Sequence, residues 1–222
     1  MFLKIGHRGA KTYETENTIE SFKKAIELGA NAVELDVRTS GDGELIVSHD
    51  DNLKKVYGED VLIHETKLVS LKELTGNRIA TLSEVLYSIS GHVEKILVEL
   101  KETGYEEKVL EVINKEKVKD KVIIVSFLGE ALAQTRALDL EIETGLIYAK
   151  IKKPIEAALN LNAQYLVPLY RFVHRRDVIK AHKSNLKVIV WTINSKDEAS
   201  LYMAKDVDGI ATDKPAIFKG IA

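Results

Sequence analysis

The chain has 222 residues, of which 45% are hydrophobic and 30% charged, and its formal net charge is −2. A chain of this length and composition can bury a full core, which excludes a disordered or collagen-like protein. The near balance of acidic and basic residues argues against nucleic-acid binding through bulk charge, and the absence of cysteine excludes disulfides, thiolate metal sites and a cysteine nucleophile.

Short β-branched runs alternate along the chain with segments of helical period, and no linker rich in proline, glycine or serine divides them. Eight runs are predicted as strands, in chain order Leu3–His7, Asn31–Val37, Lys95–Lys101, Lys121–Ser126, Ile142–Tyr148, Gln164–Pro168, Leu186–Thr192 and Val207–Thr212. Helices are predicted between them at Thr18–Leu28, Thr81–Ile89, Tyr105–Glu116, Ala131–Leu138, Pro154–Asn160, Arg176–Lys183 and Lys196–Ala204, and a short last helix is predicted after Pro215.

Many of the predicted strands are apolar on both faces, as in Val122–Val125. That pattern is typical of a parallel sheet covered by helices. Eight β/α units without a linker predict an α/β protein, a (β/α)₈ or TIM barrel that forms a single domain over residues 1–222. A doubly wound open sheet is the alternative, but the first turn lacks the G-x-G-x-x-G phosphate loop of that fold.

One segment, residues 39–48, interrupts this alternation after the second strand. Its Asp42-Gly43 pair is a strong signal for a β-hairpin with a two-residue turn. With those two residues as the turn, His49 is predicted to lie directly opposite Asp36, about 5 Å away at Cβ. The residues that follow, about 49–80, are predicted to form a small cap insertion at the barrel mouth.

Acidic side chains gather at the carboxyl ends of the second and third predicted strands, where enzymes with this fold place their active sites. Glu34 and Asp36 are two residues apart and face the same side of a strand, and so do Glu99 and Lys101. For any one carboxylate, a salt bridge is the favoured interpretation. Three carboxylates together are costly to bury unpaired, so the group favours one divalent cation, Mg²⁺ or Ca²⁺, which prefer oxygen ligands.

Two histidines are predicted to converge on the same carboxylates. His7 ends the first strand and His49 follows the hairpin. Because histidine titrates near neutral pH, one imidazole can take a proton while the other gives one. Arg8 is a candidate clamp for an anion through its fork of donors, and a surface ion pair is its alternative role.

Four further residues are assigned a structural role, a functional role or both. Asn17, with a glutamate three residues later, fits a helix cap, and the helix N-terminus that it would begin favours an anion. Glu16 is a candidate partner for the neighbouring arginine. Trp191, the only tryptophan, is either a wall for an apolar part of a substrate or core packing. Asp213, shortly before a proline, is interpreted as a helix start.

Several of these motifs together resemble one enzyme family. The segments His7-Arg8-Gly9, Glu16-Asn17-Thr18, Val33-Glu34-Leu35-Asp36-Val37 and His49-Asp50 resemble the glycerophosphodiester phosphodiesterase family, and later segments agree, namely Glu99-Leu100-Lys101, Val190-Trp191-Thr192-Ile193-Asn194 and Asp208–Pro215. The resemblance covers nearly the whole chain.

The resemblance implies a TIM barrel that hydrolyses glycerophosphodiesters to glycerol phosphate and an alcohol. Attack by the glycerol 2-hydroxyl would give a cyclic phosphate, which water then opens. The implied site has a divalent metal on Glu34, Asp36 and Glu99, with His7 and His49 as acid and base and Arg8 and Lys101 facing the phosphate. Which histidine is the base stays open at this point.

Two alternative functions stay open. One is a related phosphodiesterase of the same barrel class, acting on lysophospholipids or phosphoinositides. The other is a non-catalytic module that binds phosphate or metal. Apolar runs are far shorter than the about 20 residues of a membrane span, and Met1–Arg8 does not have the pattern of a signal peptide. We therefore expect a small-molecule substrate, no nucleic-acid partner, no stable membrane insertion and a cytoplasmic location, while the oligomeric state is left open.

Overall fold

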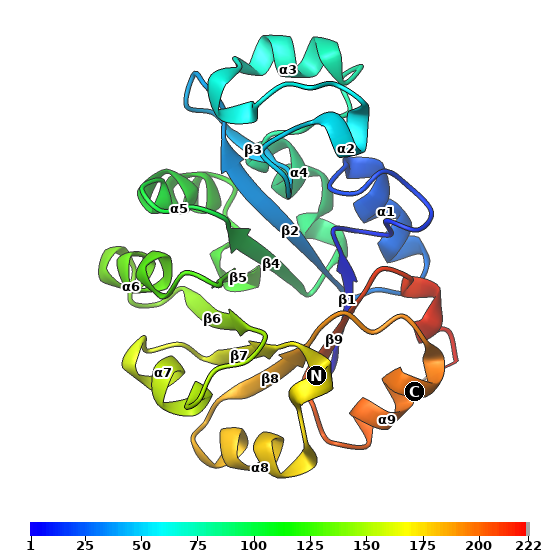
Figure 1. Cartoon of the computed structure of the whole chain (residues 1–222), viewed down its shortest axis with the longest axis vertical. Helices are drawn as coiled ribbons and strands as arrows, with labels where there is room; N and C mark the ends of the chain where they lie inside the picture. Colours follow the sequence, from blue (N-terminus) through cyan, green and yellow to red (C-terminus); the bar gives the residue numbers. More distant parts are fainter. Residues whose placement is uncertain (221–222) are drawn as a thin grey trace.

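The computed structural model describes residues 1–220, and a closed barrel of parallel strands lies at its centre (Figure 1). Within those residues the barrel strands are β1 (Leu3–His7), β2 (Ala32–Thr39), β4 (Lys95–Leu100), β5 (Val122–Ser126), β6 (Glu143–Tyr148), β7 (Tyr165–Pro168), β8 (Lys187–Val190) and β9 (Gly209–Thr212). Strand β1 closes the barrel by pairing with both β2 and β9. The predicted (β/α)₈ barrel is confirmed, and the open-sheet alternative is wrong.

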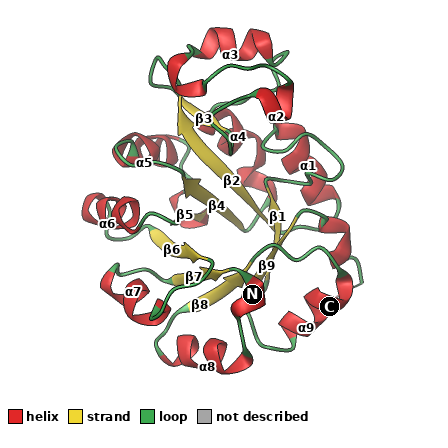
Figure 2. Ribbon diagram, viewed as in Figure 1, coloured by secondary structure: helices red, strands yellow, loops and turns green. Residues whose placement is uncertain are grey.

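The helices form a layer outside the strands (Figure 2). They are α1 (Ile19–Glu27), α4 (Leu82–Ile89), α5 (Glu106–Lys115), α6 (Gly129–Leu138), α7 (Pro154–Asn160), α8 (Arg175–Lys183) and α9 (Lys196–Met203), with short 3₁₀ helices η2 (Ser90–His92), η3 (Lys119–Lys121), η4 (Tyr170–Phe172) and η5 (Pro215–Phe218). Local caps fix several starts: the hydroxyl of Ser195 accepts the N–H of Glu198 at the start of α9, and Thr81 and Glu84 form a capping box on α4. Among residues 1–220, none of these helices is both long and apolar enough to cross a membrane.

Two apolar layers hold the barrel together. The inner layer fills the barrel and comes from strand residues that alternate with outward-facing ones, including Leu97, Ile123, Tyr165, Val167 and Ile189. The outer layer packs the opposite faces of the same strands against the helices. Because both faces are covered, most strand residues are apolar. Inward-facing charged side chains lie toward the two ends of the barrel, with the pair Lys95 and Glu143 at the amino end and Glu34, Asp36 and Glu99 at the carboxyl end.

The hairpin after β2 has a different register from the one predicted. Strand β3 (Leu45–Val47) pairs antiparallel with the end of β2, and the next residue, Ser48, donates its N–H to the carbonyl oxygen of Asp36 at 3.0 Å. Ser48 therefore lies opposite Asp36. The prediction that His49 would occupy that position is wrong by one residue.

The length of the hairpin loop explains this difference. The loop has three residues, 41–43, rather than two, and Ser40 donates its N–H to the carbonyl of Glu44 at 2.9 Å across its base. Gly43 has a φ of +80°, in the left-handed region that glycine tolerates and that closes three-residue hairpin loops. One extra loop residue moves every later pair by one position.

The insertion after the hairpin contains α2 (Lys54–Tyr57), η1 (Ile63–Glu65) and α3 (Leu68–Leu74). In Figure 1 it lies at the top of the molecule, beyond the end of β2. Its apolar side chains form a small core with one residue of β3, made of Ile46, Leu53, Ile63, Leu71 and Ile79. The insertion packs closely against Gly41 of the hairpin loop. A Cβ at that position would lie 2.7 Å from the backbone of Glu65, so the close approach requires glycine.

Candidate active site

The strand register brings the acidic and imidazole side chains to one end of the barrel. His7 pairs with Glu34 in the β1–β2 ladder, and Asp36 pairs with Glu99 in the β2–β4 ladder. The four residues thus lie on three neighbouring strands. Parallel strands end at the same edge, so these side chains meet at the carboxyl end of the barrel.

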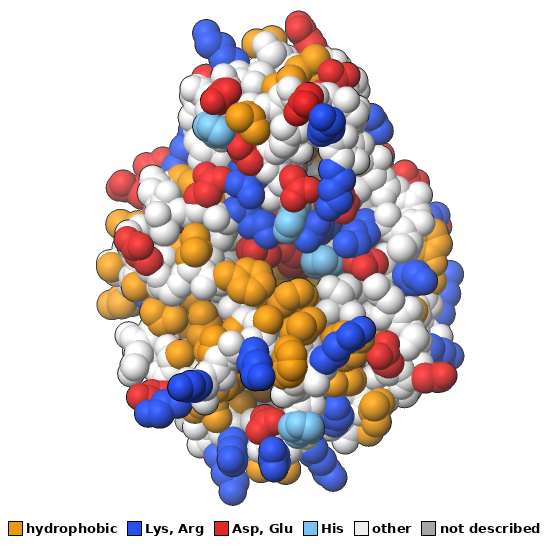
Figure 3. Space-filling view, in the orientation of Figure 1, with side chains coloured by type: hydrophobic (Ala, Val, Ile, Leu, Met, Phe, Trp, Pro, Cys, Tyr) orange, Lys and Arg blue, Asp and Glu red, His pale blue; other side chains and the backbone are white. Residues whose placement is uncertain are grey.

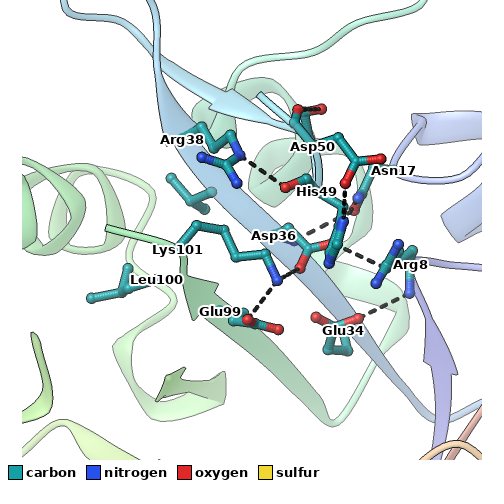
Figure 4. A network of polar contacts seen from close by, with 12 residues as sticks. Arg8, Asn17, Glu34, Asp36, Arg38, His49, Asp50, Glu99, Leu100 and Lys101 are labelled. Carbon is teal, nitrogen blue, oxygen red and sulfur yellow. Dashed lines mark hydrogen bonds and ion pairs between the residues drawn. The ribbon is translucent and has the colours of Figure 1, made fainter. Parts of the chain in front are cut away.

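The three carboxylates form one buried cluster, shown in Figure 4. One oxygen from each of Glu34, Asp36 and Glu99 lies within 4.8 Å of the others. The Lys101 ammonium lies 2.6 Å from Glu99 Oε1 and 2.9 Å from Asp36 Oδ1, and the Arg8 Nε lies 3.2 Å from Asp36 Oδ2. The cluster therefore places three carboxylates against two cations.

The ionisation of these carboxyls reflects that shortage of positive charge. Burial and the neighbouring Asp36 raise the pKa of Glu34 well above its usual range and raise the pKa of Glu99 to about 7. Burial opposes ionisation of Asp36 as well, but Lys101 and Arg8 outweigh it and hold the pKa of this carboxyl below its usual range. Lys101 and Arg8 thus compensate the negative charge of Asp36, but they do not fully compensate the charges that Glu34 and Glu99 would carry when ionised.

One oxygen in the cluster is available to a further ligand. Glu34 Oε1 is buried and has no hydrogen-bond partner among residues 1–220, while Glu34 Oε2 accepts the backbone N–H of Arg8 at 3.0 Å. A buried carboxylate oxygen without a partner is costly. Three hard oxygen donors and a deficit of positive charge fit a divalent cation, and they fit an all-protein salt-bridge network less well.

His7 is held by a carboxylate from the other end of the chain. Its Nδ1 lies 2.7 Å from Asp213 Oδ1, and its Nε2 lies 3.9 Å from Glu34 Oε2. Asn194 donates to the other oxygen of Asp213 at 2.8 Å. The interpretation of Asp213 as a helix start missed this contact, and its position after the last barrel strand was the only signal for it in the sequence.

The electrostatics of His7 favour a neutral imidazole with a defined tautomer. Burial lowers its pKa, although the hydrogen bond to Asp213 opposes that effect. Asp213 is itself an anion, because His7 and other partners outweigh its burial and lower its pKa to about 2. An ionised carboxylate only accepts hydrogen bonds, so Nδ1 carries the proton and Nε2 keeps its lone pair.

His49 has a similar carboxylate partner in the adjacent residue. Its Nδ1 lies 2.6 Å from Asp50 Oδ1, and its backbone carbonyl accepts from Arg38 Nε at 2.8 Å (Figure 4). The His49 side chain is 30% exposed, against 14% for His7. Burial lowers the pKa of His49 as well. Despite the shifted register, both imidazoles line the same cavity.

That cavity has a volume of about 190 Å³ and two chemically different sides. The polar side carries His7, Arg8, Glu34, His49, Glu99 and Lys101. The apolar side includes Phe127 and Trp191, whose rings meet edge to face with centroids 5.8 Å apart. Trp191 Nε1 donates to the carbonyl of Val167 at 2.8 Å, which fixes the indole in the wall. Figure 3 shows histidine and charged side chains below the insertion, with a hydrophobic area next to them.

Glu16 and Asn17 are not among the residues that line the cavity, but each forms a hydrogen bond with a residue of the site. Arg8 donates from NH1 to Glu16 Oε1 at 3.0 Å, and Asn17 Nδ2 donates to Asp36 Oδ2 at 2.8 Å. The prediction that Asn17 caps the first helix is wrong, because Thr18 is the N-cap of α1. The amide is occupied by the carboxylate cluster instead.

The comparisons with known proteins agree with this geometry. Residues 7–217 match the sequence profile of the Glycerophosphoryl diester phosphodiesterase family. The chain belongs to this family. A glycerophosphodiester phosphodiesterase from Caldanaerobacter subterraneus is 32% identical over 96% of this chain and 94% of that protein. The family predicted from the motifs is therefore confirmed.

Solved structures of glycerophosphodiester phosphodiesterases share the fold. The glycerophosphodiester phosphodiesterase of Thermotoga maritima has a TM-score of 0.85 at 32% identity, covering 100% of this chain and 99% of that one. A phosphodiesterase from Oleispira antarctica, solved in complex with the product sn-glycerol-3-phosphate, has a TM-score of 0.89 at 30% identity, covering 97% of this chain and 94% of that one.

Proposed function

We propose that the chain is a metal-dependent phosphodiesterase that hydrolyses glycerophosphodiesters to glycerol phosphate and a free alcohol. The observation that carries this proposal is the buried cluster of Glu34, Asp36 and Glu99, which lacks one positive charge and shares a cavity with His7 and His49. Membership of the family supports the same reaction. The residues form one catalytic domain, with the insertion of about residues 49–80 beside the cavity.

The proposed metal ligands are Glu34, Asp36 and Glu99, and the donor set suits Mg²⁺ or Ca²⁺. A bound divalent cation would offset the charge on a phosphate oxygen and lower the pKa of a bound hydroxyl. Arg8 and Lys101 are proposed to face the non-bridging oxygens of the phosphate. Asp36 and Glu99 hold the two basic side chains in place through ion pairs. The fixed positive charges of Arg8 and Lys101 would therefore stabilise the negative charge that grows on the phosphate in the transition state.

We assign the role of general base to His7. Its neutral Nε2 faces the metal-ligand side of the cavity, and Asp213 stabilises the imidazolium that forms when it takes the proton of the glycerol 2-hydroxyl. His49 is more exposed than His7, so we assign it the delivery of a proton to the departing alcohol. The two exchange roles when water opens the cyclic phosphate.

The apolar side of the cavity favours a second candidate substrate. Phe127 is 49% exposed and, with Trp191, offers an apolar surface next to the charged side. A lysophospholipid, which joins a phosphodiester to an acyl chain, fits such a two-sided cavity. A panel of diesters with polar and acylated groups ranks the two candidates by kcat/KM.

The direct test of the proposed function is turnover of glycerophosphocholine and glycerophosphoethanolamine by the purified protein with Mg²⁺, with Ca²⁺ and after chelation. We expect release of glycerol phosphate that depends on a divalent ion. Full activity after exhaustive chelation would overturn the metal assignment, and no turnover of any glycerol-containing diester would overturn the reaction.

A further inference from the structure

A second cavity lies outside the barrel wall, between α7 and α8. Its volume is about 750 Å³, against about 190 Å³ for the cavity at the barrel mouth. The loop of residues 149–153 between β6 and α7 forms one wall, and η4 with the start of α8 forms the other. Small-molecule sites commonly have volumes of about 300–1,000 Å³, so this cavity has the size of a ligand site.

The floor of this cavity is apolar. The outer faces of β7 and β8 contribute Leu166 and Val188, and α8 contributes Val178, each at most 3% exposed. Apolar side chains continue to the opening, where Ile151 is 42% exposed and Phe172 is 50% exposed. A recessed apolar surface that reaches solvent is typical of a binding site.

The rim of the cavity is basic. Four lysines border it, namely Lys150, Lys152, Lys153 and Lys180. The acidic residues of the lining are already engaged: Glu156 pairs with Lys153 at 2.8 Å, and Asp177 accepts the backbone N–H of His174 at 3.0 Å. The side-chain ammonium groups of Lys152 and Lys180 have no ion pair or hydrogen bond among residues 1–220. Figure 3 shows basic and hydrophobic side chains together in this lower part of the molecule.

We propose that this cavity binds a single-chain anionic amphiphile, with the alkyl chain on the apolar floor and the anionic head group at Lys152 and Lys180. Lysine side chains can cover apolar surface with their stems while the ammonium stays at the edge, which suits a ligand that is apolar at one end and charged at the other. The apolar surface is recessed, so the ligand is a single molecule that enters the cavity and not the surface of a bilayer.

This site is separate from the phosphodiesterase cavity. Strand β6 divides the two, because Ile147 lines the cavity at the barrel mouth and its neighbour Tyr148 lines the cavity between the helices. Successive strand residues point to opposite faces. A ligand in the outer cavity therefore lies behind the barrel wall and does not touch the carboxylate cluster.

Isothermal calorimetry with alkyl phosphates below their micelle concentration tests the proposal. The protein is saturated with Mg²⁺ and glycerol 3-phosphate, so that the barrel mouth is occupied and is not the binding site. We expect decyl phosphate to bind and each added methylene to tighten binding about four-fold up to dodecyl phosphate. Inorganic phosphate and dodecanol, which each lack one half of the ligand, should bind at least about ten-fold more weakly.

Matched charge variants locate the site. Lys152→Glu with Lys180→Glu should weaken dodecyl phosphate binding at least about ten-fold. Lys23→Glu with Lys115→Glu makes the same change in net charge on exposed faces of α1 and α5 and should change the affinity less than two-fold. Turnover of a short glycerophosphodiester should be unchanged in both double variants.

Three outcomes would overturn the proposal. Equal weakening in the two double variants would show attraction by net charge alone. No dependence on chain length would show that the apolar floor takes no part. Binding to anionic vesicles without binding of monomeric dodecyl phosphate would show a membrane-docking surface in place of a cavity for one amphiphile.

Discussion

Asp213 Oδ1 lies 2.7 Å from His7 Nδ1, although 206 positions separate the two residues in the chain. The contact exists because β1 and β9 are neighbours at the closure of the barrel. Asp213 holds the His7 ring in one orientation and one tautomer, with Nε2 facing the cavity. The imidazole that we assign as base is thus positioned by the residue that follows the last barrel strand.

Replacing Asp213 should slow catalysis and shift its pH dependence. Asp213→Asn removes the negative charge that raises the pKa of His7 and leaves at most a neutral hydrogen-bond acceptor, so the acidic limb of the kcat profile should move to lower pH. We expect kcat to fall at least about ten-fold with a much smaller change in KM. Asp208→Asn is the matched control, since Asp208 pairs with His182 at 2.9 Å. An unchanged pH profile in Asp213→Asn would refute the positioning role.

The two histidines should differ in their response to the leaving group. His7→Ala and His49→Ala should each lower kcat at least about 100-fold with a choline diester. A p-nitrophenyl diester needs little help from an acid in the first step, so the first-turnover release of p-nitrophenol should recover most of its rate in His49→Ala and little of it in His7→Ala. His64→Ala, at an exposed histidine paired with Asp51, serves as the control. The opposite pattern of recovery would exchange the two roles.

Loss of one carboxylate should weaken metal binding without unfolding the barrel. Glu34→Gln removes a charged donor whose Oε1 is free in the cluster, and we expect Mg²⁺ or Ca²⁺ affinity to fall at least about ten-fold by calorimetry. Glu102→Gln changes a carboxylate that pairs with Arg38 outside the cluster and should leave the affinity unchanged. Equal affinities in wild type and Glu34→Gln would exclude Glu34 as a ligand.

The raised pKa of Glu99 predicts a pH dependence that the metal should remove. Its pKa of about 7 in the folded, metal-free protein lies above the ordinary glutamate value, so folded protein binds more protons than unfolded protein between pH about 4.5 and 7. Glu99 therefore costs stability as pH rises through this window. The Tm of metal-free Glu99→Gln, relative to wild type, should rise from pH 5 to pH 8.

A Tm difference that is constant or falls with pH would contradict this prediction. Saturating metal should stabilise the wild type more at pH 8 than at pH 5, because ligands must be deprotonated to bind it. Comparing the variant with wild type at each pH cancels the opposing titration of His7 and His49, whose lowered pKa values act in the other direction.

Features set by local pattern could be predicted from the sequence. The alternation of strands and helices gave the barrel, and the two-residue spacing of Glu34 and Asp36 placed both on one face of β2. The pairing of Asp36 with Glu99 follows once the barrel is assumed, since parallel strands end at the same edge.

Features that depend on loop geometry or on barrel closure could not be predicted from the sequence. The Asp42-Gly43 pair suits a two-residue turn, and only the backbone reveals the three-residue loop that places Ser48 opposite Asp36. Asn17 resembles a helix cap locally, but the buried carboxylate of Asp36 occupies its amide. Asp213 could not be assigned to His7, because the closure of the barrel sets that contact.

The proposed mechanism requires three carboxylates to hold one divalent ion beside the two histidines. Anomalous scattering from a crystal soaked with Mn²⁺ and glycerol 3-phosphate tests it most directly. We expect one strong peak bound by Glu34, Asp36 and Glu99, with the phosphate between His7 and His49. A strongest peak away from these carboxylates, or a phosphate outside the reach of both imidazoles, would contradict it.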